Sequence, residues 1–204
     1  MKKQGYVFLA LFLSSGLLTG CLGSLWTGAT LVYDRHNVYK KVSDYQLSAN
    51  THRALYSDQV FKQEGCVIDI AVFNGDILLA GHLPTQALRD EALLRVSAIP
   101  DHRRLFNQID ISPQTASTLE DSWITAKIRA QIFADASIDP KAFKIITSDR
   151  IVYLMGDVRP KQAKRVINIA RKTTGVTRVV KLLKYYNLSD KASTTSKPTR
   201  KTVV

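Results

Sequence analysis

The sequence predicts an α+β protein that contains two copies of one small α-β-β-α-β unit. Residues 77–83 and 152–158 carry the same hydrophobic pattern at an offset of 75 residues, and each has a glycine at its fifth position. An alternating apolar run precedes each segment, as expected for a β-hairpin. Because self-similarity at a fixed spacing indicates a repeated structural unit, we expect two small three-stranded mixed sheets, each with two helices on one face.

The first unit is predicted over residues 46–113 and begins with a helix. The elements that follow are strands at 67–73 and 77–83, a helix at about 86–96 and a strand at about 104–111. Asn74-Gly75, between the first two strands, is a dipeptide typical of tight hairpin turns. A unit of this size has a thin core, so pairing of the two units would help to bury the remaining apolar surface.

The second unit is predicted over residues 119–188, after a linker at 112–118. Two overlapping capping-box patterns, which end at Glu120 and Asp121, start its first helix near Leu119. The remaining elements are strands at 143–147 and 152–158 with a turn at 148–150, a helix at about 161–173 and a strand at about 177–185.

Gly81 and Gly156 occupy matching positions in the two units. We interpret both as positions where a side chain would obstruct close packing or a bulge. His82 and Asp157, which follow these glycines, are predicted to face solvent at the ends of their strands.

Residues 1–20 have the features of a bacterial lipoprotein export signal: a basic start, an apolar run and small residues before a cysteine. The apolar run is shorter than the about 20 residues that span a bilayer. Leu18-Thr19-Gly20-Cys21 is a lipobox pattern. We therefore expect cleavage before Cys21 and covalent attachment of diacylglyceryl and fatty acyl groups to it, and two or three acyl chains anchor a protein almost permanently.

Residues 21–45 are predicted to form the lipidated N-terminus and a tether. Residues 189–204 are predicted to form a disordered basic tail, because they contain too few large apolar residues to bury a core. With Cys21 lipidated, Cys66 has no cysteine left for an intramolecular disulfide. Its apolar neighbours predict a buried core thiol.

The chain carries a formal net charge of +12, and loss of Lys2 and Lys3 with the export signal lowers this to +10. Such an excess calls for an anionic partner or for solvent. An exported lipoprotein meets anionic lipid, lipopolysaccharide and cell wall rather than nucleic acid. We therefore expect an anionic membrane as a partner and no nucleic acid.

The first helix of the second unit has two apolar sides. At about 100° per residue, Ile124, Ile128 and Ile132 form one stripe. Roughly opposite it gather Trp123, Ala126, Ala130, Phe133 and Ala134. One side is sufficient to pack on the sheet, so the other side is free for the first unit, a second copy of the chain, or lipid. Tryptophan suits a membrane interface because its ring is apolar and its N–H can stay hydrated.

Catalytic patterns are absent from the sequence. The four histidines are scattered, and we find no His-Glu-x-x-His pattern, no cysteine pair for zinc, no phosphate loop and no Gly-x-Ser-x-Gly elbow. We expect no enzyme activity, no metal site and no cofactor other than the covalent lipid on Cys21.

Several stretches carry a resemblance to a known family. They are 74–81 and 106–109 in the first unit, 121–129 and 175–179 in the second, and Asp34-Arg35 in the tether. With these stretches and two units behind a lipobox, the chain resembles the dual-BON outer-membrane lipoproteins, the division- and outer-membrane-stress-associated lipid-binding family. The likeness covers nearly the whole chain, as two BON domains.

This resemblance implies a noncatalytic lipoprotein held by Cys21 in the outer membrane and facing the periplasm. Leu22, rather than Asp, follows the cysteine and favours this sorting. The second BON domain is expected to bind anionic phospholipid and to support outer-membrane integrity at division sites. The implied phospholipid-binding residues are Glu120, Trp123, Lys127, Ile128 and Phe133. The alternative is a protein-protein interaction or self-association module, for example one linked to outer-membrane protein assembly, with incidental lipid contact and an open oligomeric state.

Overall fold

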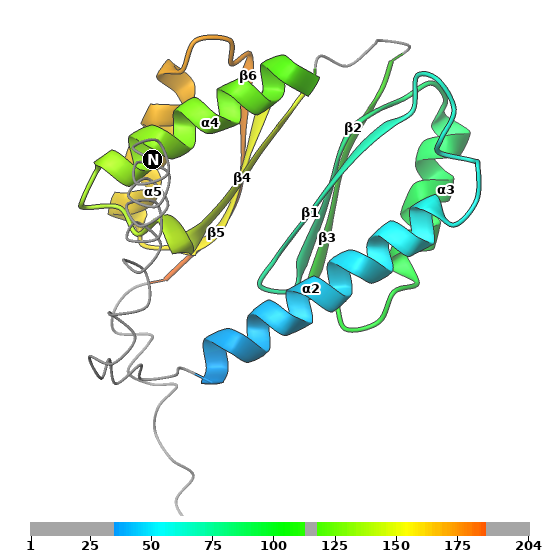
Figure 1. Ribbon diagram of the computed structural model, residues 1–204, viewed down its shortest axis with the longest axis horizontal. Coiled ribbons are helices and arrows are strands. Elements are labelled where there is room, and N and C mark those ends of the chain that lie inside the picture. Colours follow the sequence, from blue (N-terminus) through cyan, green and yellow to red (C-terminus); the bar gives the residue numbers. More distant parts are fainter. Residues whose placement is uncertain (1–34, 113–117, 187–204) are drawn as a thin grey trace, which may run out of the picture. The chain divides into compact units, whose positions relative to one another are not determined.

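Each half of the protein consists of a three-stranded sheet with helices on one face (Figure 1). The computed structural model describes residues 35–112 and 118–186, with side chains from residue 40 onward. The described residues from His36 onward belong to one structural unit. We call residues 35–112 the first repeat and residues 118–186 the second repeat.

The two repeats contain the predicted elements in the predicted order. The first repeat consists of α2 (Arg35–Tyr56), β1 (Val67–Phe73), β2 (Asp76–Leu83), α3 (Gln86–Ser97) and β3 (Arg104–Ile111). The second repeat consists of α4 (Thr118–Ala134), η1 (Pro140–Ala142), β4 (Phe143–Ser148), β5 (Ile151–Val158), α5 (Pro160–Lys172) and β6 (Arg178–Tyr185). The short 3-10 helix η1 is the one described element of the second repeat that the sequence did not predict.

The two sheets share one topology. In the first repeat, β2 lies between β1 and β3 and pairs antiparallel with β1 and parallel with β3. In the second repeat, β5 holds the same position between β4 and β6. The helix in each crossover, α3 or α5, supplies the long connection that a parallel pair requires. The predicted mixed sheets are therefore present in both repeats.

Both hairpins turn through two residues with positive φ. Asn74 and Gly75 have φ values of 50° and 79°, and Asp149 and Arg150 have values of 51° and 62°. Such two-residue turns match the right-handed twist of the flanking strands. The second turn is one residue shorter than predicted, because Ser148 still pairs with Ile151 as part of β4.

The first helix of each repeat holds the hairpin turn with an aspartate. The Asp44 carboxylate accepts hydrogen bonds from the backbone N–H groups of Asn74 and Gly75, both at 2.8 Å. The Asp121 carboxylate accepts the equivalent bonds from Asp149 and Arg150, at 2.9 and 2.8 Å. These paired contacts fix how each helix lies along its sheet.

The predicted start of the folded region is too late. Helix α2 begins at Arg35, and Asp44 already belongs to the first repeat through its bonds to the hairpin turn. Leu47, one turn later, is buried in the core. The tether predicted over residues 21–45 therefore ends about ten residues earlier, because α2 continues beyond its packed segment. The lipidation site and the predicted tail lie outside the described residues.

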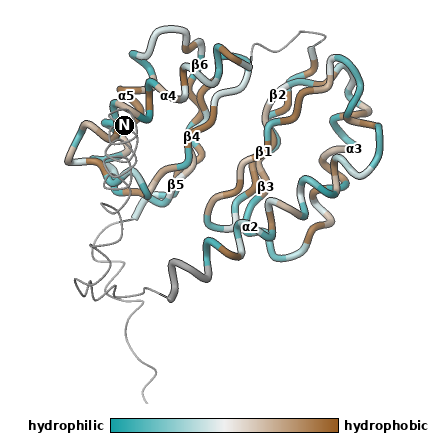
Figure 2. The backbone as a smooth tube through the Cα atoms, in the orientation of Figure 1, coloured by the Kyte–Doolittle hydropathy of each residue, from teal (hydrophilic) through white to brown (hydrophobic). Residues whose placement is uncertain are grey.

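Each repeat has its own core between helices and sheet. The isoleucine stripe of α4 packs there with Val152 and Leu154 of β5. In the first repeat, Leu55 of α2 packs with Ile77 and Leu79 of β2. Hydrophobic residues run along the strands in Figure 2, and every residue of β2 is buried. The central strands are thus covered on both faces, which is typical of strands with continuous apolar runs.

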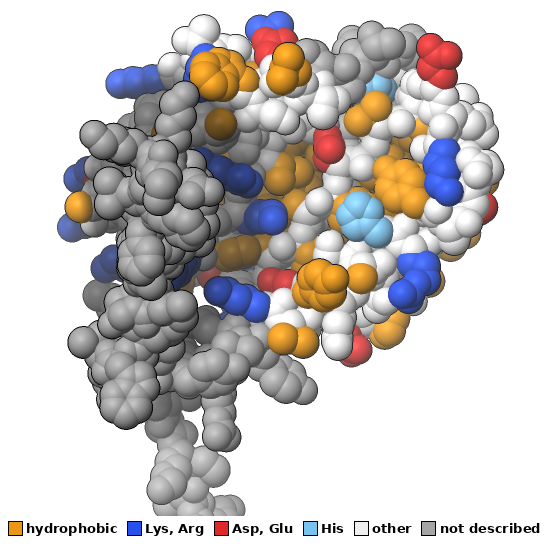
Figure 3. All heavy atoms as spheres, in the orientation of Figure 1, with side chains coloured by type: hydrophobic (Ala, Val, Ile, Leu, Met, Phe, Trp, Pro, Cys, Tyr) orange, Lys and Arg blue, Asp and Glu red, His pale blue; other side chains and the backbone are white. Residues whose placement is uncertain are grey.

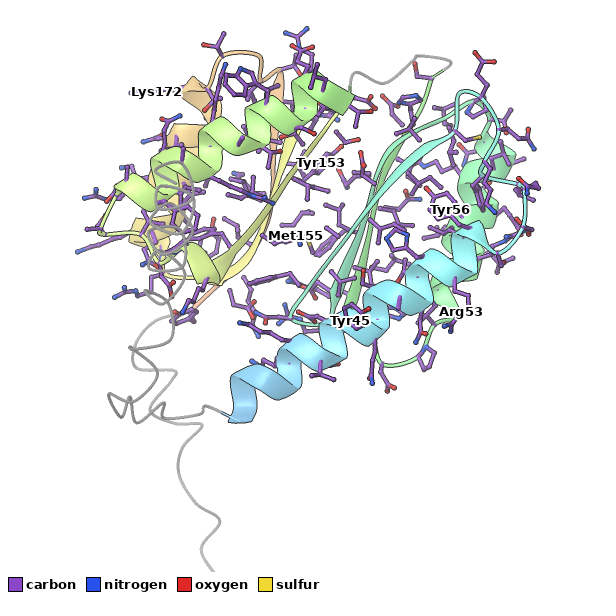
Figure 4. All side chains as sticks on the ribbon, in the orientation of Figure 1. Tyr45, Arg53, Tyr56, Tyr153, Met155 and Lys172 are labelled. Carbon is purple, nitrogen blue, oxygen red and sulfur yellow. The ribbon has the colours of Figure 1, made fainter. Side chains whose placement is uncertain are left out.

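The second face of each sheet is buried against the other sheet. Ala71, Leu78 and Ala80 of the first repeat share a hydrophobic cluster with Tyr153 and Met155 of β5. Figure 4 shows Tyr153 and Met155 leaving β5 on the side opposite to α4 and α5. This cluster provides the pairing of units that a thin core led us to expect.

The prediction that His82 and Asp157 face solvent is wrong. His82 is 1% exposed, and its Nδ1 lies 2.8 Å from Oδ2 of Asp149, in the hairpin turn of the other repeat. Asp157 accepts a hydrogen bond at 3.0 Å from the Nδ2 of Asn74, in the turn of the first repeat. The two contacts are equivalent under the 75-residue offset, so the repeats meet in a self-complementary manner.

Arg103 extends this polar contact. Its guanidinium donates to Asp76 in its own repeat and to Asp157 in the second repeat, the latter at 3.2 Å. Burial opposes ionisation of Asp76, but hydrogen bonds from Arg104 and Arg103 hold the pKa of its carboxyl below the ordinary value.

The interpretation of the two repeated glycines is confirmed. Gly81 has a φ of 109°, and a Cβ placed there would overlap the carbonyl oxygen of Val67. At Gly156 a Cβ would come within 2.5 Å of the carbonyl oxygen of Ala142. Both positions therefore require a residue without a side chain.

Candidate functional site

Helix α4 carries the candidate site, and its orientation is set by its buried side. Asp121, Ile124, Ile128 and Ile132 are buried, and three isoleucines at successive turns pack on the sheet. Thr125 adds a hydrogen bond of 2.7 Å between its hydroxyl and that of Thr147 on β4. The predicted division of the helix into two apolar sides is thus present in the structure, with the isoleucine side inside.

The opposite side of α4 exposes large hydrophobic side chains. Trp123 is 61% exposed, Phe133 is 72% exposed, and Leu119, which we did not select from the sequence, is 85% exposed. The spacing of Leu119 and Trp123, four residues apart on one helix face, could have identified the leucine. The first repeat packs on the sheet of the second repeat rather than over these side chains, so it is not the partner that covers them.

Ile128 does not belong to this surface. The resemblance implied that Ile128 contacts phospholipid, but its side chain is 0% exposed and lies in the core. It stands one turn after Ile124 and one turn before Ile132, so it shares their buried face. We therefore remove Ile128 from the candidate site.

Lys127 and Trp123 form one unit on the helix surface. The Lys127 Nζ lies 5.1 Å from the centroid of the Trp123 ring, within the range of a cation-π contact. The contact places a positive charge directly beside an exposed aromatic ring. This pairing suits a boundary where phosphate groups meet apolar chains.

Glu120 is half exposed and has a structural partner. Its Oε1 lies 3.3 Å from the Nε of Arg150, which also donates to the carbonyl oxygen of Gly175 at 3.0 Å. Glu120 therefore helps to hold the start of α4 against the hairpin turn and the loop before β6. Because one oxygen of its carboxylate is engaged in this ion pair, Glu120 is a supporting residue of the surface.

The surface made by Leu119, Trp123, Lys127 and Phe133 is hereafter the α4 surface. Exposed hydrophobic side chains also occur on the first repeat, where orange side chains lie along α2 in Figure 3. Tyr45 on α2 is 76% exposed and Leu94 on α3 is 66% exposed. What distinguishes the second repeat is its charge.

The basic charge of the protein is concentrated in the second repeat. Residues 118–186 contain 14 Lys and Arg and 6 Asp and Glu, whereas residues 35–112 contain nine of each. The first repeat is therefore neutral, and the second carries a formal charge of +8. An anionic partner is attracted to the repeat that also presents the α4 surface.

The described residues offer no other chemical centre. They contain no cluster of three or more His, Cys, Asp or Glu that could hold a metal ion. Burial raises the pKa of the Cys66 thiol, which is only partly buried rather than fully buried as predicted. Burial also raises the pKa of Tyr153 to about 12, so both groups stay protonated at neutral pH. Within the same ranges, no helix combines the length and apolar character needed to cross a bilayer.

Comparison with known proteins agrees with this architecture. Residues 120–187 match the family model of the BON domain. A protein from Haemophilus influenzae named outer membrane lipoprotein DolP is 27% identical over 187 residues, which cover 91% of this chain and 96% of that protein. A 21 kDa hemolysin from Actinobacillus pleuropneumoniae is 27% identical over 154 residues, which cover 74% of this chain and 79% of the relative.

Among solved structures, CdsD, a structural protein of the type III secretion system of Chlamydia trachomatis, matches with 10% sequence identity. The match covers 73% of this chain and 96% of CdsD, with a TM-score of 0.30. A score at this level does not bear on the fold or the function.

Proposed function

Because the chain belongs to the DolP-like family of BON-domain outer-membrane lipoproteins, we propose that its second repeat binds anionic phospholipid through the α4 surface and so supports outer-membrane integrity. The protein is lipid-anchored in the outer membrane and faces the periplasm. In our proposal Cys21 carries the acyl chains, and the protein acts without catalysis or a cofactor.

One observation carries the lipid-binding proposal: a tryptophan and a phenylalanine are exposed on a helix whose other side already fills the core. Burying a side chain of this size contributes about 1.5 to 3 kcal/mol. The indole can place its N–H among headgroups while its ring enters the acyl region. Lys127, held over the ring, supplies the charge that faces phosphate.

The lipid anchor makes weak binding by the α4 surface sufficient. A protein already held on a bilayer meets that bilayer at a high effective concentration, so a second contact needs little intrinsic affinity. We infer that the anchor at Cys21 and the α4 surface act as two attachments of one molecule, and division sites are where we expect this contact to concentrate.

The first repeat has the element order and sheet topology of the repeat that matches the BON model. We propose that it is a second BON domain whose task is to support the second repeat. Its neutral charge supports this division of labour. The predicted domain limits at 46 and 113 would then extend back to the start of α2.

The test is liposome binding by the mature chain with Cys21→Ser, which removes the acyl anchor. Trp123→Glu is expected to weaken binding to vesicles that contain phosphatidylglycerol by roughly 10- to 100-fold, because the variant loses apolar burial and gains repulsion. Leu94→Glu is the matched control, since Leu94 is 66% exposed on the first repeat, and it should bind as the parent does. Equal binding by both variants and the parent would contradict the proposal.

A second candidate function is that of a protein-protein interaction or self-association module. Its partner would be a second copy of the chain or a component of outer-membrane protein assembly. The observation that favours it is a hollow of about 270 Å³ beside Phe133, lined by Ile132, Pro140 and Phe143 among others, which could hold a side chain. A concentration-dependent mass that Trp123→Glu or Phe133→Glu abolishes, with vesicle binding unchanged, would favour this candidate.

A further inference from the structure

The C-terminal part of the second repeat is basic without interruption. Residues 158–186, which span α5 and β6, contain nine Lys and Arg and no Asp or Glu. Helix α5 buries Ala163, Val166 and Ala170 against the sheet and turns its charged residues outward. A surface with charges of one sign attracts anions and repels cations over about a Debye length.

Three of these cations line one shallow groove between α5 and β6. The groove has a volume of about 350 Å³ and is lined by Pro160, Ala163, Lys164, Ile167, Asn168, Arg171, Lys181 and Tyr185. Lys164 and Arg171 come from α5, and Lys181 comes from β6. The groove therefore gathers charges from a helix and from the strand that follows it.

The strand register explains how β6 contributes to the groove. Side chains alternate along a strand, and Val179 and Leu183 pack into the core beneath the helices. Lys181 and Tyr185 lie two residues from Val179 or Leu183 along the strand. Their side chains are therefore on the same face of β6, the face toward α5. Val180 and Leu182 are on the opposite face of β6 and pack between the two sheets. Lys184 is on the same face as Leu182, so its side chain lies away from the groove.

The cations of this groove are not neutralised within the described part of the chain. No described residue forms an ion pair with Lys164, Arg171 or Lys181. A larger hollow of about 520 Å³ lies near the start of α5 and is lined partly by Arg159, Lys161 and Arg165. There, Arg165 is paired with Asp135 at 3.1 Å. The α5–β6 groove is smaller than this hollow, but all three of its cations are without an ion-pair partner in the described part of the chain. It is therefore the better candidate for an anion site.

We propose that the α5–β6 groove binds the phosphate headgroup of an anionic phospholipid in the same bilayer that the α4 surface enters. The proposal rests on the function proposed above and gives it a second contact. Arg171 can donate two parallel hydrogen bonds to a phosphate, and the two lysines add charge. Asn168 and the hydroxyl of Tyr185, which is 52% exposed, supply neutral donors.

A bilayer fits these residues better than a soluble anion does. Helices α4 and α5 lie side by side on one face of the sheet, so their outer sides belong to one helical layer (Figure 1). The aromatic ring of Tyr185 at the rim suits the interface between headgroups and acyl chains. One layer thus presents an apolar insert on α4 and a phosphate site beside α5.

The test compares two triple variants of the mature Cys21→Ser chain. The groove variant carries Lys164→Gln, Arg171→Gln and Lys181→Gln. The control variant carries Lys40→Gln, Lys62→Gln and Lys184→Gln, which removes the same charge from exposed positions outside the groove. Matching thermal unfolding curves for both variants and the parent exclude loss of folding as the cause.

We expect the groove variant to bind phosphatidylcholine vesicles containing phosphatidylglycerol about 100-fold more weakly than the parent, at about 1 kcal/mol for each basic residue near the surface. The control variant should lose less than about tenfold. The salt dependence of binding should also become shallower in the groove variant alone, because fewer ionic contacts remain to be screened.

The outcomes separate this proposal from the one on which it rests. Equal losses in the two triple variants overturn the groove, while a loss with Trp123→Glu leaves the α4 surface in place. No loss with Trp123→Glu overturns the proposed function. Inorganic phosphate serves as the second probe in calorimetry. If the groove variant loses phosphate binding but keeps vesicle binding, the groove serves a soluble anion and the lipid proposal is wrong.

Discussion

Ile128 and Trp123 lie five positions apart on one helix and have opposite environments. Ile128 is 0% exposed in the core, and Trp123 is 61% exposed. Both are large apolar residues, so residue type alone does not separate a core position from a surface position. The difference comes from the angle at which each leaves α4, which decides whether it meets the sheet or the surroundings of the protein.

This difference can be measured as stability. Ile128→Ala should lower the free energy of unfolding by about 2 to 5 kcal/mol, because it leaves a cavity in a packed core. Trp123→Ala should change it by less than about 1 kcal/mol, since an exposed side chain loses few contacts. Chemical denaturation of both variants checks the assignment. A large loss for Trp123→Ala would show that the tryptophan is covered in solution.

At the scale of elements, each repeat ties its first helix to its hairpin by one carboxylate. Asp121 has two backbone N–H partners in a turn whose two residues, Asp149 and Arg150, both carry side chains at positive φ. Asp44 makes the same contacts to Asn74 and Gly75, where the glycine adopts positive φ at little cost. The second hairpin therefore depends more on its aspartate.

We expect Asp121→Ala to lower the free energy of unfolding by about 2 kcal/mol, because two partly buried backbone N–H donors lose their acceptor. Asp44→Ala should cost less. Asp121→Asn should be the mildest change at this position, since an amide oxygen still accepts one bond and carries no charge to bury. Urea unfolding of the three variants tests this order. A greater loss for Asp44→Ala than for Asp121→Ala would contradict the argument from turn strain.

At the scale of the whole molecule, the contact between the repeats buries titratable groups. The Ser148 hydroxyl donates to Asp69 of the other repeat at 2.5 Å, and His82 pairs with Asp149 close by. Burial raises the pKa of Asp69; the bond from Ser148 opposes the rise, the carboxylates of Asp121 and Asp149 add to it, and His82 opposes it. The contact thus favours the protonated carboxyl.

The sign of the pH dependence follows from this shift. A raised pKa in the folded protein means that Asp69 contributes stability below its unfolded pKa of about 4, and that this contribution is lost as pH rises through the folded value. Asp69→Asn keeps an acceptor for Ser148 and removes the charge. The variant should therefore lose less stability than the parent as pH rises above about 4.

Unfolding measured at several pH values checks this expectation. Asp90→Asn is the control, because Asp90 is exposed on α3 and bonded only to Gln86 within its own helix. Parallel pH profiles for the parent and Asp69→Asn would show that the repeat contact does not carry the raised pKa.

Features that depend on a local pattern could be predicted from the chain alone. The 75-residue repeat, the hairpins, the isoleucine stripe of α4 and the need for glycine at 81 and 156 all follow from spacing along the chain. Backbone geometry converts such spacing directly into a helix face or a strand face.

Features that depend on a partner surface could be read only from the folded protein. His82 and Asp157 are strand ends by pattern, yet each is held by the hairpin turn of the other repeat. Arg171 and Lys181 share a groove because β6 pairs beside β5 and under α5. Burial and charge clustering are set by which surfaces meet, and contacts between residues distant in the chain leave no periodic trace in the sequence.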